Sequence, residues 1–518
     1  DLVHAWTDDG WRGHALEDYV VYELHVGTFT AEGTFDAIIP HLARLRALGV
    51  TAIEVMPVAQ FPGERNWGYD GVGLFATQHS YGGARGLQRL VDACHAADLA
   101  VVLDVVYNHL GPEGNYLGAF APYFTDAYQT PWGAALNFDG AGSDEVRRFF
   151  VENALQWLRD FHVDALRLDA THAIIDRSAR PFLEELAAAA AACARQSGRP
   201  AYLIAESDAN DPRLIRAPEH GGFGLDAMWC DDFHHAVHSL LTGERDGYYA
   251  DYGEVDHLAR AWRRGLTYAG EYSEFRARRH GREIPELEPR QVFVCVQNHD
   301  QVGNRMRGER FGELVDFESE KLAAGLLLLS PYVPLLFMGQ EYGEKRPFQY
   351  FVSHGDDELV EAVRRGRREE FASFGWQGEV PDPQSPETMA DCVLDHEART
   401  AGDHARLYEL YRRLLEMRAQ LRSFPEDVHG QDDEGWLRVE RPQAQMWFHF
   451  GTAVRRVSVA DAGGGQLALD SAAAEWGGPG SLTAPSIGRG DEVVLQPRSF
   501  VVYTKATATP SSVKGKRA

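Results

Sequence analysis

Cysteine is scarce in this chain, and no two cysteines stand near each other. Only 5 of the 518 residues are cysteines, and they are Cys94, Cys193, Cys230, Cys295 and Cys392. An odd number of widely spaced cysteines without a C-x-x-C pair argues against a disulfide framework and against a zinc site built on thiolates. The pattern indicates buried, reduced thiols, and we expect a cytoplasmic protein.

Basic residues are also in deficit. The chain contains 51 Lys and Arg against 77 Asp and Glu, which gives a formal net charge of -26. A surface of this charge repels phosphate backbones and anionic lipids. We therefore expect no nucleic-acid partner, no membrane partner, and a neutral molecule as the substrate.

Long apolar runs are missing as well. The most apolar stretch, residues 323–339 (AAGLLLLSPYVPLLFMG), is interrupted by Ser330, Pro331 and Pro334. A helix that spans a bilayer needs about 20 consecutive apolar residues. This stretch therefore predicts a core helix followed by a buried strand.

The two ends of the chain differ from the rest in composition. Residues 1–18 begin with DLVHAWTDDGWRGH, which has neither an initiator Met nor the basic and then apolar pattern of a signal peptide. They predict a linker cut from an upstream domain. Residues 506–518 are polar and basic and contain Pro and Ser, which is typical of a disordered tail.

Eight short apolar runs alternate with helical patterns along the chain. The runs cover residues 19–26, 51–57, 99–109, 163–172, 201–207, 225–229, 291–300 and 333–341. Between them lie amphipathic segments such as residues 35–49 and residues 181–198. Continuous apolar strands that alternate with helices predict a parallel sheet buried on both faces. Eight of them predict an α/β fold with a (β/α)8 TIM barrel.

A change of pattern near residue 426 marks a second domain. After an amphipathic helix over residues 405–421, short alternating strands follow, separated by Gly-, Pro- and Asp-rich turns. We expect a catalytic barrel over residues 19–425 and a C-terminal antiparallel β-sandwich over residues 426–505. Three stretches are too long for ordinary barrel connections and predict inserted loops, namely residues 106–143, 230–290 and 340–403.

Polar side chains gather at the carboxyl ends of the predicted strands, where a TIM barrel keeps its active site. They are Asp104, Asn108, His109, Arg167, Asp169, His172, Glu206, Asn298, His299, Asp300, Gln340 and Glu341. A single pair such as Arg167 and Asp169 could be a structural ion pair. Because several strands end in this way, and their ends meet on one face, we favour a functional site that contains Asp169.

Four of these strand ends resemble the α-amylase family of glycoside hydrolases. They are DVVYNH (104–109), LRLDATH (166–172), IAES (204–207) and QNHD (297–300), and they occur in the order of that family. The resemblance implies that Asp169 is the nucleophile, that Glu206 is the general acid/base, and that Asp300 is a third carboxylate that holds the sugar. Without the resemblance, Asp300 could equally be a local turn residue.

Retaining hydrolysis of a glycosidic bond needs two carboxyl groups in different protonation states. One is ionised and forms a covalent glycosyl intermediate, and the other protonates the leaving oxygen and later activates water. Arg167 precedes Asp169 by two residues on the same strand face, so we expect it to keep Asp169 ionised. Burial and neighbouring carboxylates are expected to raise the pKa of Glu206.

The resemblance also implies contacts with the sugar. Tyr69, in NWGYDG (66–71), would be an aromatic platform beneath the ring. His109 and His299 would donate hydrogen bonds to sugar hydroxyls, and His172 would lie on the leaving-group side. As isolated residues, each of these histidines would more often be structural.

Two further residues bear on the site. Asp104 is expected to support it without contacting the reaction. Asn108 stands where many members of the family hold a structural calcium, but no partner ligands can be identified in residues 106–143. We therefore expect no metal and no cofactor.

Within that family, the closer resemblance is to the maltooligosyltrehalose trehalohydrolases. It is carried by ATH (170–172), residues 228–253, NHDQVGNR (298–305) and FMGQEYGEKRPFQYFVSH (337–354). Those enzymes carry a β-sandwich before the barrel, so the resemblance implies that such an N-terminal domain is absent from this chain. It also implies that Asp231 and Asp232 contact the leaving group. Without the resemblance, residues 230–238 (CDDFHHAVH) more simply indicate the acidic first turn of a helix.

The implied reaction belongs to trehalose biosynthesis. It is hydrolysis of the α-1,4 bond next to the terminal trehalose of maltooligosyltrehalose, and a companion maltooligosyltrehalose synthase would supply this substrate without a stable complex. A glycogen-branching enzyme, which transfers chains, and a general α-amylase, which cuts maltooligosaccharides freely, stay open as alternatives. A glycan-binding barrel without catalysis is disfavoured because all three carboxylates are present.

Overall fold

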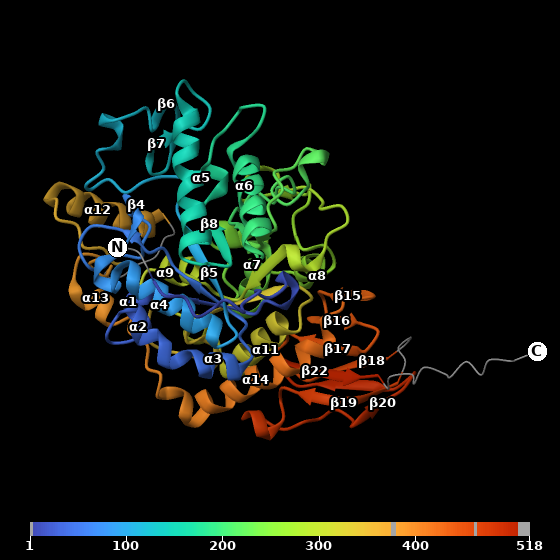
Figure 1. The fold of residues 1–518 in the computed structure, drawn as a ribbon. Helices are drawn as coiled ribbons and strands as arrows, with labels where there is room; N and C mark the ends of the chain where they lie inside the picture. The colour runs from blue at the N-terminus through green and yellow to red at the C-terminus, as the bar shows by residue number, and fades with distance from the viewer. Residues whose placement is uncertain (1–3, 374–379, 460–463, 506–518) are drawn as a thin grey trace, which may run out of the picture.

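The centre of the molecule is a closed barrel of eight parallel strands (Figure 1). The structure is a computed structural model, and it describes residues 4–373, 380–459 and 464–505. The strands are β1 (Val21–Leu24), β2 (Ala52–Val55), β5 (Ala100–Val105), β8 (Ala165–Leu168), β9 (Tyr202–Ala205), β10 (Ala227–Trp229), β13 (Val292–Cys295) and β14 (Val333–Phe337). They close in the order β1-β14-β13-β10-β9-β8-β5-β2. Each strand falls within one of the eight predicted runs, so the prediction of a TIM barrel is confirmed.

The barrel interior is filled in layers, because side chains alternate between the two faces of each strand. One layer is apolar and includes Val21, Ala52, Val102 and Ala165. The next layer lies two residues further along the same strands, and it consists of Glu23, Glu54, Asp104 and Arg167. All four of these side chains are buried. An apolar floor is thus covered by a charged layer on the side where the strands end.

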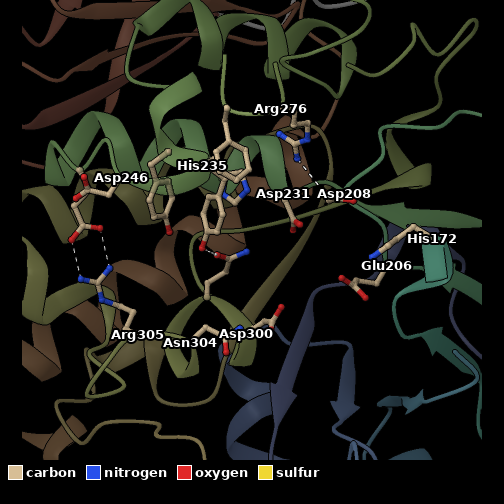
Figure 2. Close-up of a pocket in the computed structure, with 15 residues that line it drawn as sticks. His172, Glu206, Asp208, Asp231, His235, Asp246, Arg276, Asp300, Asn304 and Arg305 are labelled. Atoms are coloured by element: carbon tan, nitrogen blue, oxygen red, sulfur yellow. Dashed lines mark hydrogen bonds and ion pairs between the residues drawn. The ribbon is translucent and has the colours of Figure 1, made fainter. Parts of the chain in front are cut away.

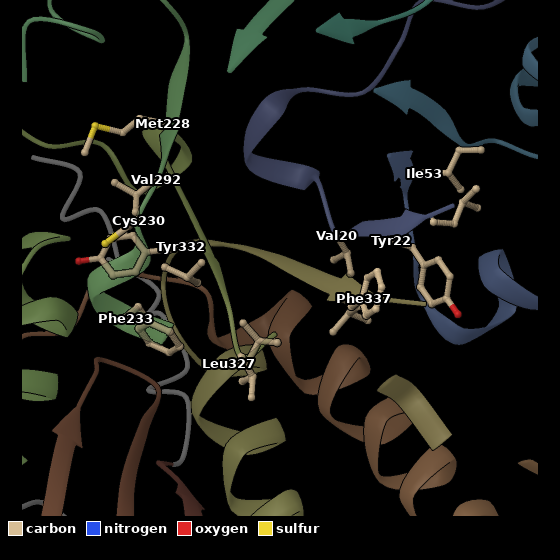
Figure 3. Packing of buried hydrophobic residues seen from close by; sticks show 14 of the residues in the cluster. Val20, Tyr22, Ile53, Met228, Cys230, Phe233, Val292, Leu327, Tyr332 and Phe337 are labelled. Carbon is tan, nitrogen blue, oxygen red and sulfur yellow. The ribbon is translucent and has the colours of Figure 1, made fainter. Parts of the chain in front are cut away.

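Helices cover the outside of the barrel. They include α4 (Gly83–Ala96), α5 (Ser143–Asp160), α6 (Phe182–Ser197), α7 (Asp231–Thr242), α8 (Val255–Arg264), α11 (Phe317–Leu328) and α14 (Gly402–Leu421). Figure 3 shows part of the core between the barrel strands and the surrounding helices. In it, Phe233 of α7 and Leu327 of α11 belong to one buried cluster with Tyr22 and Phe337 of the strands. The apolar stretch 323–339 forms the end of α11 and β14, as predicted.

One predicted helix is divided in the structure. Residues 35–49 form α2 (Phe35–Ile38), a 3-10 turn (Ile39–His41) and α3 (Leu42–Leu48). The division falls at Pro40, which has no backbone N–H and therefore cannot continue an α-helical hydrogen-bond pattern. The segment ends at Gly49, whose φ of 115° is open to glycine and strained for other residues.

The C-terminal region forms two antiparallel sheets that face each other. The larger consists of β15 (Asp427–Gln431), β16 (Trp436–Glu440), β17 (Ala444–His449), β22 (Ser499–Thr504), β19 (Gly465–Asp470) and β20 (Ser486–Ile487), in that order. The smaller pairs β18 (Arg455–Ser458) with β21 (Glu492–Leu495). Side chains of both sheets, among them Trp447, Val457, Val493 and Val501, share one buried cluster. The predicted antiparallel C-terminal domain is therefore present.

The three stretches predicted as inserted loops contain regular structure. Residues 106–143 include a hairpin of β6 (Phe124–Thr130) and β7 (Gly133–Leu136). Residues 230–290 hold α7, α8 and a small hairpin of β11 (Tyr272–Ser273) and β12 (Arg278–Arg279), and residues 340–403 hold α12 (Asp357–Ser373) and α13 (Pro386–Ala390). The helices of the second stretch are short because Gly243 and Gly265 end them in left-handed conformations.

The described part of the predicted linker lies against the amino-terminal end of the barrel. His95 bridges Asp8 at 2.8 Å and Asp164 at 3.0 Å, and the indole of Trp11 donates to Asp164 at 2.7 Å. The predicted disordered tail, residues 506–518, lies outside the described residues. Within the described ranges, no helix has the length and apolar character needed to cross a bilayer.

Candidate active site

Arg167 is the centre of a cluster of charged groups at the mouth of the barrel. Its Nη1 donates to both oxygens of Asp104, at 2.9 and 2.8 Å, and to Oδ1 of Asp169 at 2.9 Å. Its Nη2 lies 3.4 Å from Oε2 of Glu206. The ring of Trp229 lies against the guanidinium, with its centroid 4.4 Å away. One cation therefore holds the two carboxyl groups predicted to perform catalysis, and it holds Asp104 as the predicted support.

The two carboxyl groups differ in their remaining hydrogen bonds. The amide of Asn108 donates to Oδ2 of Asp169, so the carboxylate of Asp169 accepts from an amide and from a guanidinium. Glu206 accepts from the backbone N–H of Ala170. Ala170 directly follows Asp169 and has a φ of 40°, a left-handed conformation that is strained for a residue with a Cβ atom. The strained turn brings the N–H of Ala170 to Glu206.

Glu206 lies in surroundings that favour its protonated form. Burial raises the pKa of Glu206 to about 8, because it outweighs the opposing effect of Arg167. Repulsion from Asp169, Asp300 and Asp231 acts in the same direction as burial. A carboxyl group that keeps its proton near neutral pH can act as a general acid. This agrees with the role that the sequence predicts for Glu206.

Asp300 and Asp231 face Glu206 across the site. Figure 2 shows the three carboxyl groups pointing into the same space. Asp300 lies in α9 (His299–Gly303), which is capped by Asn298, and it accepts from the amide of Asn304 at 2.8 Å. Burial raises the pKa of Asp231 to about 7, and the charge of Asp300 adds to the shift. Asp231 begins α7, with one residue between it and the end of β10.

Tyr69, His299 and Asp104 form a chain of hydrogen bonds beneath the cleft. The Tyr69 hydroxyl lies 2.6 Å from Asp104 and 2.7 Å from Nε2 of His299. Nδ1 of His299 contacts Glu23. Burial alone would lower the pKa of His299, but the charge of Glu23 raises it to about 9. Burial also raises the pKa of Asp104, to about 6, against the opposing charge of Arg167.

His109 lies at the same cleft but is held by protein groups. Its ring nitrogens contact the side chain of Asn108 and, at 3.0 Å, the carbonyl of Tyr69. Trp132, at the tip of the β6–β7 hairpin, stacks on its ring with centroids 4.7 Å apart. His109 therefore faces the cleft through its ring beneath Trp132, and in this structure both of its nitrogens are occupied.

The cleft has two adjoining parts that meet at the catalytic carboxyl groups. One part is lined by Asn66, Trp67, Tyr69, Asp70, His109, Trp132, Asp169, His299, Tyr350 and Arg367. The other is lined by Asp208, Asp231, His235, Glu244, Asp246, Tyr248, Phe275, Arg276 and Arg305. His172, Glu206, Asp300 and Asn304 line both parts. A chain-like substrate can therefore extend to either side of Glu206.

Asp231 and Asp232 stand in different surroundings although they are neighbours in α7. Asp231 lines the cleft, whereas Asp232 is buried behind it. Asp232 accepts from Asn210 at 2.8 Å and from the backbone N–H groups of Thr267, at 2.8 Å, and Tyr268, at 3.0 Å. The structure thus brings Asp231 into the site and places Asp232 in the wall that supports it.

The contacts of Asn108 bear on whether this side chain could bind a metal ion. Its amide nitrogen donates to the backbone carbonyl and the carboxylate of Asp169, and its oxygen contacts the ring of His109. The amide nitrogen of Asn108 is thus used by Asp169, and its oxygen has a partner in His109. Across the described residues, no group of three or more His, Cys, Asp or Glu side chains is arranged to hold a metal ion.

Comparison with known proteins agrees with this geometry. The family model "Alpha amylase, catalytic domain" matches residues 7–129. A malto-oligosyltrehalose trehalohydrolase of Rhizobium sp. (strain M-11) is 48% identical over 460 residues, which are 86% of this chain and 77% of that protein. A malto-oligosyltrehalose trehalohydrolase of Arthrobacter ramosus is 50% identical over 459 residues, which are 88% of this chain and 78% of that protein.

The chain belongs to the malto-oligosyltrehalose trehalohydrolase family. It is therefore a glycoside hydrolase of the α-amylase family. A crystal structure of an α-amylase-like protein from Salmonella typhimurium superimposes on it with a TM-score of 0.87 at 38% identity, covering 98% of this chain and 85% of that chain. The resemblance inferred from four strand ends is thus confirmed.

Several residues of this cleft were not predicted from the sequence. They are Trp132, Asp208, Glu244, Tyr248, Phe275, Arg276, Asn304 and Arg305, together with Glu23, which is buried behind His299. Most of them lie in the inserted stretches, where no strand pattern relates them to the barrel. A signal did exist for Glu23, because a charged residue in the middle of an otherwise apolar strand is rarely buried without a specific partner.

Proposed function

We propose that this enzyme hydrolyses the α-1,4 bond next to the terminal trehalose of maltooligosyltrehalose, with retention of configuration. The main support is Arg167, which contacts Asp169 through one guanidinium nitrogen and Glu206 through the other. The nucleophile and the acid are thus close enough to share one side chain. Retaining glycosidases hold these two groups about 5–5.5 Å apart, whereas inverting enzymes leave room for a water between them.

In the first step, a carboxylate oxygen of Asp169 attacks the anomeric carbon of the sugar. The bond to the leaving oxygen breaks as Glu206 transfers its proton to that oxygen, so the trehalose part departs as an alcohol. Arg167 keeps Asp169 aligned and charged, and the raised pKa of Glu206 supplies the proton at neutral pH. Asp300 accepts hydrogen bonds from hydroxyls of the sugar under attack.

In the second step, Glu206, now ionised, removes a proton from a water molecule. The resulting oxygen attacks the anomeric carbon from the face that trehalose has left, and the bond to Asp169 breaks. The acid and the nucleophile return to their starting forms. Two inversions at one carbon give net retention.

The leaving group is assigned to the part of the cleft on the α7 side. Its lining mixes carboxyl groups with the aromatic rings of Tyr248, Tyr249 and Phe275, and with Arg276, which contacts Asp208 at 3.2 Å. Phe275 is 50% exposed, so its ring is open to a sugar face. This mixture of donors, acceptors and rings suits a disaccharide with many hydroxyl groups. The names of the relatives support trehalose as that disaccharide.

The deciding experiment compares maltotetraosyltrehalose with maltohexaose as substrates. We expect trehalose as the main product of the first and much lower kcat/KM for the second. The newly formed reducing end should appear first as the α-anomer in proton NMR spectra. Equal rates on both substrates would indicate a general α-amylase, transfer to a sugar 6-hydroxyl would indicate a branching enzyme, and initial β-anomer would contradict retention.

Asp169→Asn tests the assignment of the nucleophile. We expect this variant to keep its fold and to lose nearly all activity, because an amide cannot form the glycosyl ester; removing the nucleophile of a covalent mechanism can cost about 10⁶-fold in kcat. Asp160→Asn, on the outer surface of α5, is the matched control and should keep wild-type activity. Substantial activity in Asp169→Asn would remove Asp169 from this role.

We also propose that the enzyme works in the cytoplasm and receives its substrate from a separate synthase. All five cysteines lie in the described ranges as buried free thiols, which supports a reducing compartment.

A further inference from the structure

Glu23 is a fully buried carboxyl group in the charged layer of the barrel, and it contacts His299 twice. Its Oε2 accepts from the backbone N–H of His299 at 3.0 Å, and its Oε1 contacts the ring Nδ1. Glu23 comes from β1, and His299 begins α9 after β13. The carboxylate thus fixes both the backbone and the ring of a residue that lines the cleft beside Asp169 and Glu206.

The hydrogen bonds around His299 determine where its protons lie. Both oxygens of Asp104 accept from Arg167, so Asp104 acts as an acceptor toward Tyr69. The single hydroxyl proton of Tyr69 is used in that bond, and the Tyr69 oxygen must therefore accept from Nε2 of His299. Nδ1 donates to Glu23. Both ring nitrogens donate, which makes the ring an imidazolium.

The other charged groups around His299 agree with this assignment. Asp300 favours the charged ring and Arg167 opposes it, and the pKa of His299 rises to about 9 mainly because of Glu23. Burial lowers the pKa of the nearby His25 to about 4, so His25 is neutral. Burial also holds the pKa of Glu54 well above its usual range. Neither oxygen of Glu54 has a hydrogen-bond partner among the described residues.

We propose that Glu23 is a positioning residue for the proposed hydrolysis: it fixes His299 as an imidazolium whose Nε2–H faces the cleft. When the sugar binds, one of its hydroxyls replaces Tyr69 as the acceptor of this proton, and Tyr69 keeps its bond to Asp104. A charge-assisted hydrogen bond is roughly twice as strong as a neutral one. Contacts to hydroxyls of the sugar under attack strengthen in the transition state, so this inference, which rests on the proposed function, predicts an effect on kcat above all.

The protonation of His299 can be measured without substrate. Long-range 1H–15N NMR of the whole enzyme with labelled histidine distinguishes an imidazolium from a neutral ring, and His299→Gln identifies the signal. We expect both nitrogens of His299 to be protonated at neutral pH. A neutral ring in the wild-type enzyme would overturn the inference, whether or not any variant folds. The result does not depend on which glycan is hydrolysed.

Glu23→Gln then tests the coupling, with Glu54→Gln as the matched control. Both changes replace a buried carboxyl of the same layer by an amide, but only Glu23 contacts His299. We expect Glu23→Gln to leave His299 neutral at neutral pH, to lower kcat about tenfold and to change KM less than about threefold, because a neutral ring is the weaker donor. Glu54→Gln should behave as the wild type, since neither oxygen of Glu54 has a hydrogen-bond partner among the described residues.

The pH profile separates positioning from simple damage to the fold. If His299 must be charged, Glu23→Gln should recover part of its activity at acidic pH, where the ring takes up a proton. A uniform loss at every pH, or an unchanged His299 signal in Glu23→Gln, would overturn the inference. Failure of the wild-type enzyme to release trehalose would overturn the proposed function and leave the NMR result intact.

Discussion

At the scale of single residues, the site depends on carboxyl groups whose pKa values are raised by burial. Glu206 is the main case, because burial raises its pKa to about 8. Its proton is available to the leaving oxygen only below that pH. We therefore expect kcat/KM to fall above about pH 8, by about tenfold for each further pH unit. A pH profile of the wild-type enzyme measures this limb, and a limb that begins well below pH 7 would contradict the assignment of Glu206 as the acid.

The same raised pKa has a consequence for stability. A carboxyl group whose pKa is higher in the folded state binds its proton more tightly there, so its contribution to stability falls as the pH rises from about 4.5 to about 8. Glu206→Gln carries no such proton. We expect this inactive variant to unfold at a higher temperature than the wild type, with a difference that grows across that range and then levels off. Thermal unfolding at several pH values measures the difference, and one that shrinks as the pH rises would contradict the shift.

At the scale of elements, the first two residues of α7 have different roles. Asp231 lines the cleft, and Asp232 supports the wall behind it. Asp231 faces the cleft with a pKa raised to about 7, and Asp232 accepts hydrogen bonds from three segments of the wall. Asp232→Asn would place amide protons against backbone N–H groups, and leaving such buried donors without an acceptor costs about 1–3 kcal/mol each. We expect a clear fall in the midpoint of urea unfolding.

Asp231→Asn is the matched change one residue earlier. It removes a half-buried carboxyl group that lines the cleft and accepts no structural hydrogen bond from the described residues, so the urea midpoint should stay or rise. Its effect should appear in kcat/KM for maltooligosyltrehalose, and in an alkaline limb at lower pH, because Asp231 helps to raise the pKa of Glu206. If Asp231→Asn loses stability while Asp232→Asn does not, the two residues have been assigned the wrong way round.

The elements also show what the sequence could and could not predict. The eight strands were predictable because strands buried on both faces are continuous apolar runs with their polar residues at the carboxyl ends. The sharing of Arg167 among Asp104, Asp169 and Glu206 was only partly predictable. Its bond to Asp169 follows from spacing along one strand, but its contacts with Asp104 and Glu206 depend on the register between neighbouring strands.

Register and chain reversal also explain what was missed. Trp132 reaches His109 because a hairpin inside residues 106–143 folds back over the cleft. The sequence around Trp132 and the sequence around His109 do not indicate that the hairpin folds back in this way. His109 was predicted to donate to a sugar, and the structure shows both of its nitrogens occupied. The buried acids of β1 and β2 were visible as interruptions of apolar runs, but the partner of Glu23 comes from α9, at the far end of the barrel sequence.

At the scale of the whole molecule, Asp8 at the amino end of the barrel stands in different surroundings from Glu206 and Asp231 at the carboxyl end. The carboxyl end holds acids whose pKa values are raised and a strained Ala170, which makes it costly to fold and suited to chemistry. The amino end holds paired charges. Burial works against the ionised form of Asp8, but hydrogen bonds from His162 and His95 outweigh it and lower the pKa of Asp8. This pairing fastens residues 4–15 to the barrel.

The last prediction concerns that fastening. Asp8→Asn would weaken three contacts at once, to His95, His162 and Arg199, while the exposed neighbour Asp9 offers a control in Asp9→Asn. Because the pKa of Asp8 is lowered in the folded state, its contribution is present above its ordinary pKa and is lost as the pH falls. We expect trypsin at pH 8 to cut Asp8→Asn faster than the wild type after the exposed Arg12, and the difference in unfolding temperature between the two proteins to shrink as the pH falls below about 4.

Changes at the two ends of the barrel should differ in their effects on kcat and on stability. In a TIM barrel, residues at the amino end of the strands serve stability and those at the carboxyl end serve catalysis. Asp8→Asn should therefore lower the temperature of unfolding while kcat stays within about twofold of the wild type, since losing a buried charged hydrogen bond costs about 1–3 kcal/mol but moves no group of the cleft. None of the described contacts of residues 4–15 reaches the carboxyl end of the barrel directly. A large fall in kcat with unchanged stability would therefore contradict a purely structural role of Asp8 and would mean that this segment affects the cleft indirectly, through the barrel.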